Sequence, residues 1–93
     1  MYKVEKTSRF KKKEKLLRKR GYDMSELNTV IEMLKNDEIL DWRYHDHQLY
    51  GDKRRYRECH IKPNWILIYQ KIENILILSL IDTGTHDEVF NTH

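Results

Sequence analysis

Histidines are concentrated in the second half of the sequence, where four of them stand at His45, His47, His60 and His86. An imidazole has a reference pKa of ~6.5, so both of its protonation states are available near neutrality. It can therefore act as a general base or a general acid, and a positioned group of this kind contributes about 10² to 10⁴ in rate. His93 stands at the end of the chain and is set aside.

Cleavage of RNA without a metal ion is one chemistry that such a set could perform. It needs a base for the 2′-hydroxyl proton, an acid for the leaving 5′-oxygen, and cations that stabilise the charged phosphorane. Histidines suit the first two roles, and guanidinium groups match the geometry of phosphate. The nearby candidates for the cationic role are Lys53, Arg54, Arg55 and Arg57. An exposed strand that uses charge to resist aggregation would account for one or two of them.

Metal binding is the competing use of the histidines. His45-Asp46-His47 could chelate locally, with His60 and His86 completing a tetrahedral site. Cys59 is the only cysteine, however, so no thiolate cluster accompanies them. Taken singly, an imidazole is more often a surface or capped side chain. The sequence therefore predicts no metal site and no cofactor. The carboxylates form no evident catalytic pair either: Asp46, Glu58, Asp82 and Asp87.

Aromatic side chains in the same half of the chain could stack on bases. Such stacking is worth roughly 1 to 3 kcal/mol per base. The same side chains are natural core for a small sheet, and we assign Tyr69 to the core. Phe90 follows His86 closely and lies near the chain end, so both uses stay open for it.

Composition bounds the class of protein. The chain has 93 residues, of which 39% are hydrophobic and 35% charged, as in a globular domain with a heavily solvated surface. We expect a single domain over residues 1–93. No run approaches the ~20 apolar residues of a membrane-spanning helix, and the start lacks the apolar segment of a secretion signal. These features predict a cytoplasmic protein with no membrane partner.

Charge is distributed unevenly along the chain. Residues 1–20 carry ten basic and two acidic side chains, a net charge of +8, whereas residues 21–93 carry eight and thirteen, a net charge of −5. A cationic segment can attract a phosphate backbone or an acidic protein, although a solvated helix face is an equally good explanation. The candidate phosphate contacts in it are Lys11, Lys12 and Lys13.

Patterning predicts the elements that must position these residues. Alternation predicts a strand over residues 2–6. Helical spacing then predicts a basic helix over 8–20, with a stripe of Phe10, Leu16 and Leu17, ended by Gly21. Asp23 and Glu26 have the spacing of a capping box, so a second helix should begin there and run to about Lys35. Its apolar face should lie on a sheet.

The second half reads mainly as strands. Residues 36–53 predict a loop with at most a short strand, and residues 55–61 a strand with Tyr56, Glu58 and His60 on one side. A turn at 62–64 separates it from a hairpin over 65–71 and 75–80. Residues 83–85 should end the last strand and set His86 on a turn or short helix, with Val89 and Phe90 folding back.

The expected fold is therefore α+β, in the order β-α-α-β-β-β. An N-terminal strand and a two-helix hairpin pack on a small antiparallel sheet, and a short helix follows at the C-terminus. Such a sheet could bring His47, His60 and His86 to one edge.

Three stretches of the sequence resemble a known family. Residues 46–51, 56–69 and 83–90 contain the elements D-H-x-L-x-G, Y-R-x-x-H-I-x-P-x-W and T-G-[ST]-H-x-x-x-F. Together they are similar to the YafQ-like branch of the RelE/ParE toxin superfamily, over nearly the whole chain. The resemblance implies a RelE/ParE-like domain that acts as a ribosome-dependent messenger RNA endoribonuclease. It also implies co-expression with a DinJ-like antitoxin that inhibits it.

The resemblance also assigns roles to residues. His47 and His60 look like active-site histidines, and His86 looks like the proton donor to the leaving oxygen. The positions that would orient the substrate are Asn64, Trp65 and Phe90.

Two residues depart from the family pattern. Asn64 stands where many relatives have an aspartate, and because an amide cannot act as a base, that role moves to His60 or His47. Asp82 stands where several relatives have an arginine, and we expect it to add negative charge near the phosphate unless Arg57 or Arg54 offsets it. Both substitutions predict an activity below that of the relatives.

The resemblance implies partners as well. These are messenger RNA in the ribosomal A site, ribosomal RNA held by the helix lysines, and an antitoxin that joins an otherwise monomeric toxin in a heterotetramer or similar complex. The antitoxin surface stays open. The alternative is a non-catalytic binder of the same fold, either a gyrase poison or a decayed toxin that only binds its antitoxin. A basic RNA-binding domain is a third possibility.

Overall fold

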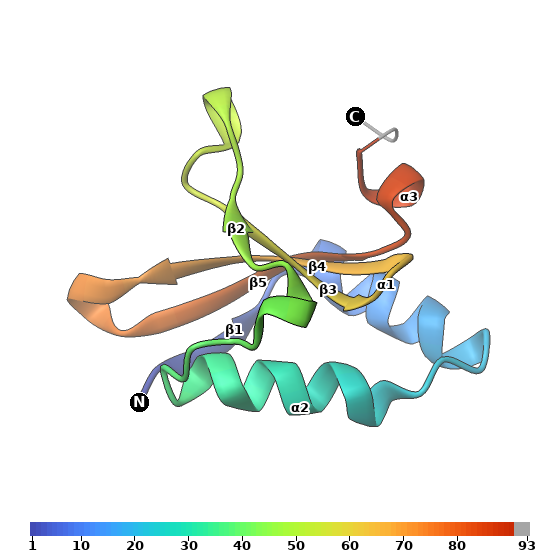
Figure 1. Cartoon of the computed structure of the whole chain (residues 1–93). Coiled ribbons are helices and arrows are strands. Elements are labelled where there is room, and N and C mark those ends of the chain that lie inside the picture. Colours follow the sequence, from blue (N-terminus) through green and yellow to red (C-terminus); the bar gives the residue numbers. More distant parts are fainter. Residues whose placement is uncertain (91–93) are drawn as a thin grey trace.

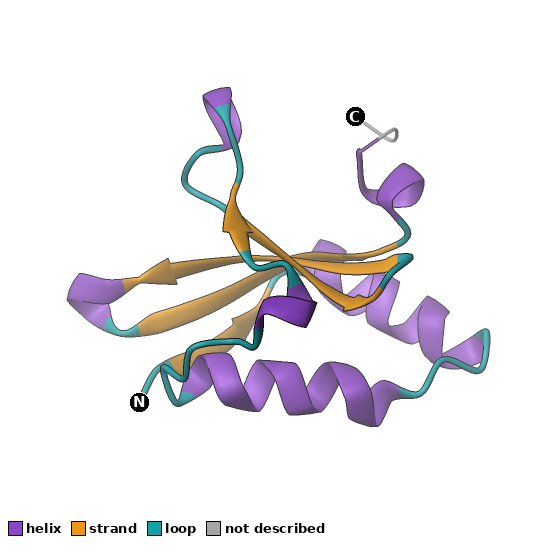
Figure 2. Ribbon diagram, viewed as in Figure 1, coloured by secondary structure: helices purple, strands orange, loops and turns teal. Residues whose placement is uncertain are grey.

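The structure, a computed structural model, describes residues 1–90, so His93 lies outside it. The helices and strands, in chain order, are β1 (Lys3–Lys6), α1 (Ser8–Lys19), α2 (Met24–Lys35), β2 (His47–Gln48), β3 (Arg57–Lys62), β4 (Trp65–Ile72), β5 (Ile77–Gly84) and α3 (His86–Phe90). Short 3-10 helices lie between them: η1 (Trp42–Tyr44), η2 (Gly51–Lys53) and η3 (Glu73–Ile75). Figures 1 and 2 show their arrangement.

The five strands form one sheet in the order β1-β5-β4-β3-β2. The pairs from β2 to β5 are antiparallel, as predicted, but β1 pairs with β5 in parallel. Hairpin signals predict only strands joined by tight turns, and both helices stand between β1 and the rest of the sheet. The predicted α+β fold, with an N-terminal strand, two helices and a short C-terminal helix, is confirmed.

Helices α1 and α2 cover the same face of the sheet (Figure 1). The apolar stripe of α1 uses Phe10 and Leu17, which are fully buried, whereas Leu16 is exposed, contrary to expectation. The face of α2 packs as predicted, with Leu27, Val30, Ile31 and Leu34 in the main core together with residues of β3, β4 and β5. Within residues 1–90, the helices are too short and too polar to span a membrane.

The start of α2 is only partly the predicted capping box. The Asp23 carboxylate accepts a hydrogen bond from the backbone N–H of Ser25, as an N-cap should. Hydrogen bonds from the Ser25 side chain and backbone lower the pKa of Asp23. Glu26 does not reach back to the cap; its Oε1 pairs with Lys62 Nζ at 3.0 Å. This ion pair ties the first turn of α2 to the β3–β4 turn.

A second, smaller apolar cluster occupies the other face of the sheet. It contains Ile66, Ile68 and Val89, with Leu49, Tyr56, Ile81 and Phe90 packed against it. Residues 47–56, which contain β2 and η2 and are called the arm below, rise from this face, and so does α3 (Figure 1). Val89 and Phe90 therefore fold back onto the sheet as predicted.

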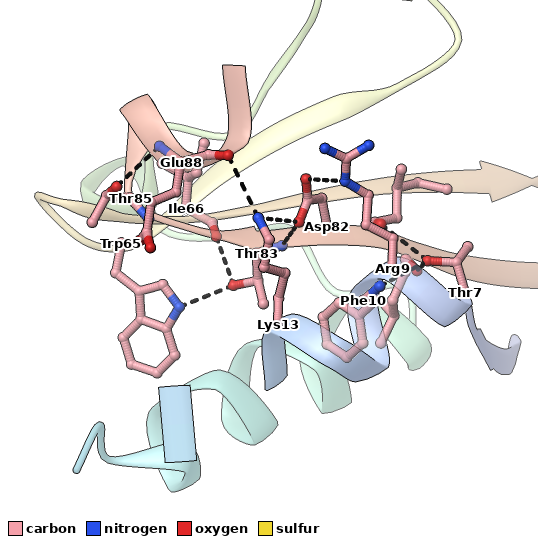
Figure 3. A network of polar contacts seen from close by, with 12 residues as sticks. Thr7, Arg9, Phe10, Lys13, Trp65, Ile66, Asp82, Thr83, Thr85 and Glu88 are labelled. Atoms are coloured by element: carbon pink, nitrogen blue, oxygen red, sulfur yellow. Dashed lines mark hydrogen bonds and ion pairs between the residues drawn. The ribbon is translucent and has the colours of Figure 1, made fainter. Parts of the chain in front are cut away.

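Strand β5 runs further than the sequence predicts, because Thr83 and Gly84 still belong to it. The Thr83 hydroxyl donates to the carbonyl of Ile66 at 2.8 Å and accepts from the Trp65 indole N–H at 2.9 Å (Figure 3). Gly84 has φ +147°, and a Cβ there would lie 3.4 Å from Glu88 Oε1. Glycine thus allows the strand to lead directly into α3.

We predict that Thr83→Val destabilises the protein by about 1 to 3 kcal/mol, because the buried indole N–H of Trp65 loses its acceptor while the side-chain shape is kept. Thr83→Ser, which keeps the hydroxyl, should cost less. Urea unfolding followed by tryptophan fluorescence measures both. Equal losses for the two variants would show that the hydrogen bond does not matter.

Candidate active site

Three imidazoles surround the carboxylate of Glu58, which is buried, with 3% of its surface exposed. Glu58 Oε1 lies 3.0 Å from His47 Nε2 and 3.2 Å from His60 Nε2. Its Oε2 lies 3.3 Å from His86 Nε2. One carboxylate thus joins histidines from β2, β3 and α3, which are far apart in the sequence.

Strand register explains this convergence. His47 is the partner of Glu58 in the β2–β3 ladder, so the two side chains share one face. His60 follows Glu58 by two residues and returns to the same face. Opposite them on β4 stand Ile68 and Ile66, which belong to the smaller apolar cluster beneath the site.

His47 and His60 each lie between two acceptors. Besides Glu58, His47 Nδ1 lies 3.2 Å from the carbonyl of Gln48, and His60 Nδ1 lies 3.4 Å from that of Pro63. Both ring nitrogens can donate only when the imidazole carries two protons. His86 contacts Glu58 through Nε2, and its side chain is the most exposed of the three, at 57%. One edge of this ring is therefore open to a ligand.

The aromatic rings near the site continue the row of histidines. The centroids of His60 and His86 are 6.5 Å apart, and His86 lies 4.7 Å from Phe90. Lys53 Nζ stands 5.6 Å from the centroid of the Phe90 ring. The structure thus brings Phe90 and Lys53 to the histidines.

The other predicted cations lie elsewhere. Arg54 and Arg55 are exposed on the arm, and Arg55 lies over the Tyr56 ring. Arg57 points to the opposite face, where its guanidinium binds Asp46 at 3.0 Å and donates to the Tyr69 hydroxyl. It is therefore not brought to the histidines. The hydrogen bond with Asp46 raises the pKa of Arg57, and burial raises that of Tyr69.

Trp65 and Asn64 have different surroundings. The Trp65 side chain is buried at 3% exposure, with its ring edge-on to Tyr22 at 4.9 Å. Its predicted role in orienting the substrate is therefore corrected, because β4 turns this side chain into the core beneath the helices. Asn64 is exposed in the turn beside Pro63, whose carbonyl faces His60.

Asp82 also differs from the expectation. Its carboxylate is buried and pairs with Arg9 Nε at 2.9 Å and Lys13 Nζ at 3.3 Å, both on α1 (Figure 3). The charge of Asp82 is therefore offset by α1 and not by Arg57 or Arg54. Lys13 is occupied there, whereas Lys11 and Lys12 are exposed.

The same side of α1 holds α3 in place. Arg20 Nη1 lies 2.7 Å from Glu88 Oε2, and Lys13 reaches the Glu88 carbonyl. Glu88 and Thr85 exchange hydrogen bonds between side chain and backbone, which closes the first turn of α3. Because His86 is the first residue of α3, these contacts position its ring.

The described residues offer no evident metal centre. Within residues 1–90, no group of three or more histidine, cysteine, aspartate or glutamate side chains is arranged to hold a metal ion. Cys59 is buried. Burial is the main cause that raises the pKa of its thiol, and the negative charges of Asp46 and Glu58 raise it further. It is a core residue and not a nucleophile.

The sequence of the chain is similar to those of known proteins. Residues 2–91 match the family described as bacterial toxin of type II toxin–antitoxin system, YafQ. The chain is 36% identical over 88 residues, 94% of each chain, to the mRNA interferase toxin YafQ of Escherichia coli K12.

Structural comparisons agree. A copper-bound mutant toxin from Helicobacter pylori is 39% identical with a TM-score of 0.92, covering 97% of this chain and 100% of that one. YafQ in the E. coli DinJ–YafQ complex is 35% identical with a TM-score of 0.88, covering 97% and 99%.

We predict that Asp82→Asn destabilises the protein by about 1 to 3 kcal/mol, because the Arg9 and Lys13 cations lose a buried counterion while Arg9 keeps partial access to water. The matched control is Asp52→Asn, an exposed carboxylate on η2. Urea denaturation of both variants tests this. If the two variants unfold at the same urea concentration, Asp82 does not anchor α1.

Acid should weaken the attachment of α3. The Arg20 hydrogen bond, and then that from the Thr85 N–H, hold the pKa of Glu88 below its ordinary value of 4.5. The contribution of Glu88 to stability is therefore complete above that ordinary value and is lost as the pH falls through the lower, folded value. Urea midpoints between pH 6 and pH 3 should fall more steeply for the wild type than for Glu88→Gln. Parallel curves would contradict this coupling.

Proposed function

The chain belongs to the YafQ family of bacterial type II toxins, and on this premise we propose that it cleaves messenger RNA with the histidines gathered around Glu58. The observation that carries the proposal is the carboxylate of Glu58 in contact with His47, His60 and His86. This cluster holds both a proton acceptor and a proton donor. It needs no metal ion for acid–base cleavage.

The reaction is a transesterification within the RNA strand. A base takes the proton of a 2′-hydroxyl, the 2′-oxygen attacks the adjacent phosphorus, and the bond to the 5′-oxygen breaks. An acid returns a proton to that oxygen, leaving a 2′,3′-cyclic phosphate and a 5′-hydroxyl. Both proton transfers suit imidazoles held a few ångströms apart.

We assign the acid role to His86. Its side chain is the most exposed of the three, its Nε2 contacts Glu58, and its ring packs beside Phe90. His60 or His47 is the base, since Asn64 in the nearby turn has no titratable group. Glu58 is buried and contacts the imidazoles, so it is a positioning residue that also offsets their positive charge.

One carboxylate cannot offset three imidazolium ions. The second and third positive charges would repel each other across the short distances of the cluster. The proposed mechanism therefore divides the acid and base roles between different rings of the cluster. Lys53, beside Phe90, is the cation best placed to contact the scissile phosphate.

We further propose that the toxin acts on messenger RNA in the ribosomal A site. The exposed Lys11 and Lys12 of α1 would then contact ribosomal RNA, supported by the net charge of +8 over residues 1–20. Its inhibitor would be a DinJ-like antitoxin, since a relative has been solved as a DinJ–YafQ complex. We propose a monomeric toxin that joins the antitoxin in a heterotetramer or a similar assembly.

We predict that His86→Ala lowers the cleavage rate by roughly 10² to 10⁴, the usual contribution of a positioned acid. Glu58→Gln should also lower the rate, because a neutral amide no longer offsets the positive charge that the imidazoles carry during proton transfer. Mapping of messenger RNA 5′ ends in a translating extract measures both. Ile75→Ala, exposed in η3 between β4 and β5, is the control.

Two outcomes would contradict the proposal. If messenger RNA stays intact in the presence of the wild-type chain, the proposed nuclease activity is wrong. Growth arrest that survives replacement of all three histidines would point to a non-catalytic toxin, such as a gyrase poison. An activity that persists in His86→Ala with an unchanged pH profile would remove His86 from the acid role.

A further inference from the structure

A groove continues from the histidine cluster toward α2. Its volume is about 850 Å³, within the range of roughly 300 to 1,000 Å³ common for small-ligand pockets. It is lined by His47 and His60 of the cluster and by Glu26 and Thr29 of α2. Its other lining residues include Arg43, Tyr44, His45, Lys62 and Pro63. The groove is therefore continuous with the site to which cleavage is assigned.

Aromatic rings lie in this groove and beside it: Tyr44 and His45 line it, whereas Trp42 lines a second hollow that shares His45 with it. Trp42 on η1 is 83% exposed, although burying an indole is among the larger apolar gains available to a small domain. It meets the His45 ring edge-on with centroids 6.5 Å apart, and His45 in turn lies 5.6 Å from His60. Rings therefore run from Trp42 through His45 to the catalytic cluster.

The charges of the groove favour an anion. Lys62 is paired with Glu26 at 3.0 Å. The guanidinium of Arg43 lies over the Tyr44 ring and donates to its hydroxyl, and within residues 1–90 it pairs with no carboxylate. Arg43 thus supplies an uncompensated positive charge, held against the groove wall.

A second hollow fixes the direction in which a strand could run. Trp42 and His45 line it, together with five carboxylates and the two cations Arg57 and Lys71, which pair with Asp46 and Asp37. The other three carboxylates, those of Glu38, Asp41 and Glu73, repel phosphate. A polyanion that contacts Trp42 and His45 is therefore directed to the side of Arg43.

We propose that the nucleotide next to the scissile phosphate binds at the edge of this groove, with its base stacked on the Trp42 ring just outside it and its phosphate held by Arg43. The inference rests on the proposed nuclease function and extends it to a subsite outside the histidine cluster. Proteins that bind single-stranded nucleic acids without strict sequence preference use exposed aromatic rings, on which bases stack, next to cationic side chains. The His45 ring contacts both the Trp42 ring and the His60 ring, so it connects the proposed stacking position with the histidine cluster.

Binding of a labelled single-stranded RNA hexamer with 2′-O-methyl groups tests the proposal, since it lacks the attacking hydroxyl and stays intact. Trp42→Ala should weaken binding about ten-fold with an unchanged salt dependence. Arg43→Gln should weaken it and flatten the slope of log affinity against log salt by about 0.7, as expected for one lost phosphate contact. Fluorescence anisotropy gives both quantities.

Trp42→Phe provides a rescue with its own signal. Phenylalanine can still stack, so affinity should stay within about two-fold of the wild type. Tryptophan emission should be quenched by RNA in the wild type but not in Trp42→Phe, because the remaining Trp65 is buried. Ile39→Ala is the matched control, since Ile39 is 96% exposed and borders the same second hollow as Trp42.

The outcomes separate this subsite from the nuclease proposal. Wild-type affinity and salt dependence in both Trp42→Ala and Arg43→Gln would overturn the subsite, even if the wild type cleaves RNA. An equal loss in Ile39→Ala would also overturn it, by indicating a general apolar surface such as a protein contact. Binding that depends on Trp42 and Arg43 in a chain that cuts no RNA would support the subsite and reject the nuclease.

Discussion

The structure depends on one buried negative charge, that of Glu58. Burying a carboxylate is costly unless donors surround it, and here the donors are imidazoles from three separate elements. The β2–β3 register must place His47 opposite Glu58, and β5 must lead straight into α3 so that His86 reaches the other oxygen. The arm and the C-terminal helix are thus held by the same interaction that gathers the titratable groups.

The cationic first helix does structural work that composition alone does not reveal. Arg9 and Lys13 compensate Asp82 (Figure 3). Arg20 holds Glu88, so three of the ten basic residues in 1–20 brace β5 and α3. Lys11 and Lys12 remain exposed. The net charge of this segment therefore overstates the part of it that faces solvent for a partner.

Local patterns predicted the helices to within one residue and the faces of β3, because helical and strand periodicity are properties of neighbours in sequence. Alternation along β3 already placed Arg57 on the face of the strand opposite to that of Glu58. This is why the Arg57 side chain points away from the histidines. What the sequence could not provide was register across β2 and β3. Without it, Glu58 was one of four carboxylates with no evident role, and nothing indicated that β1 would pair with β5 in parallel.

Asp82 and Asn64, the two residues that depart from the family pattern, have different physical surroundings. The negative charge of Asp82 is balanced by the Arg9 and Lys13 cations of α1, with which it forms ion pairs. Asn64 lies next to Pro63, whose carbonyl faces His60, and in the proposed mechanism its amide would leave proton transfer to the imidazoles. Under the proposed mechanism the rings then differ by environment alone: His60 is enclosed between two acceptors, whereas His86 is open on one edge. That asymmetry is what would allow chemically identical groups to divide the roles of base and acid.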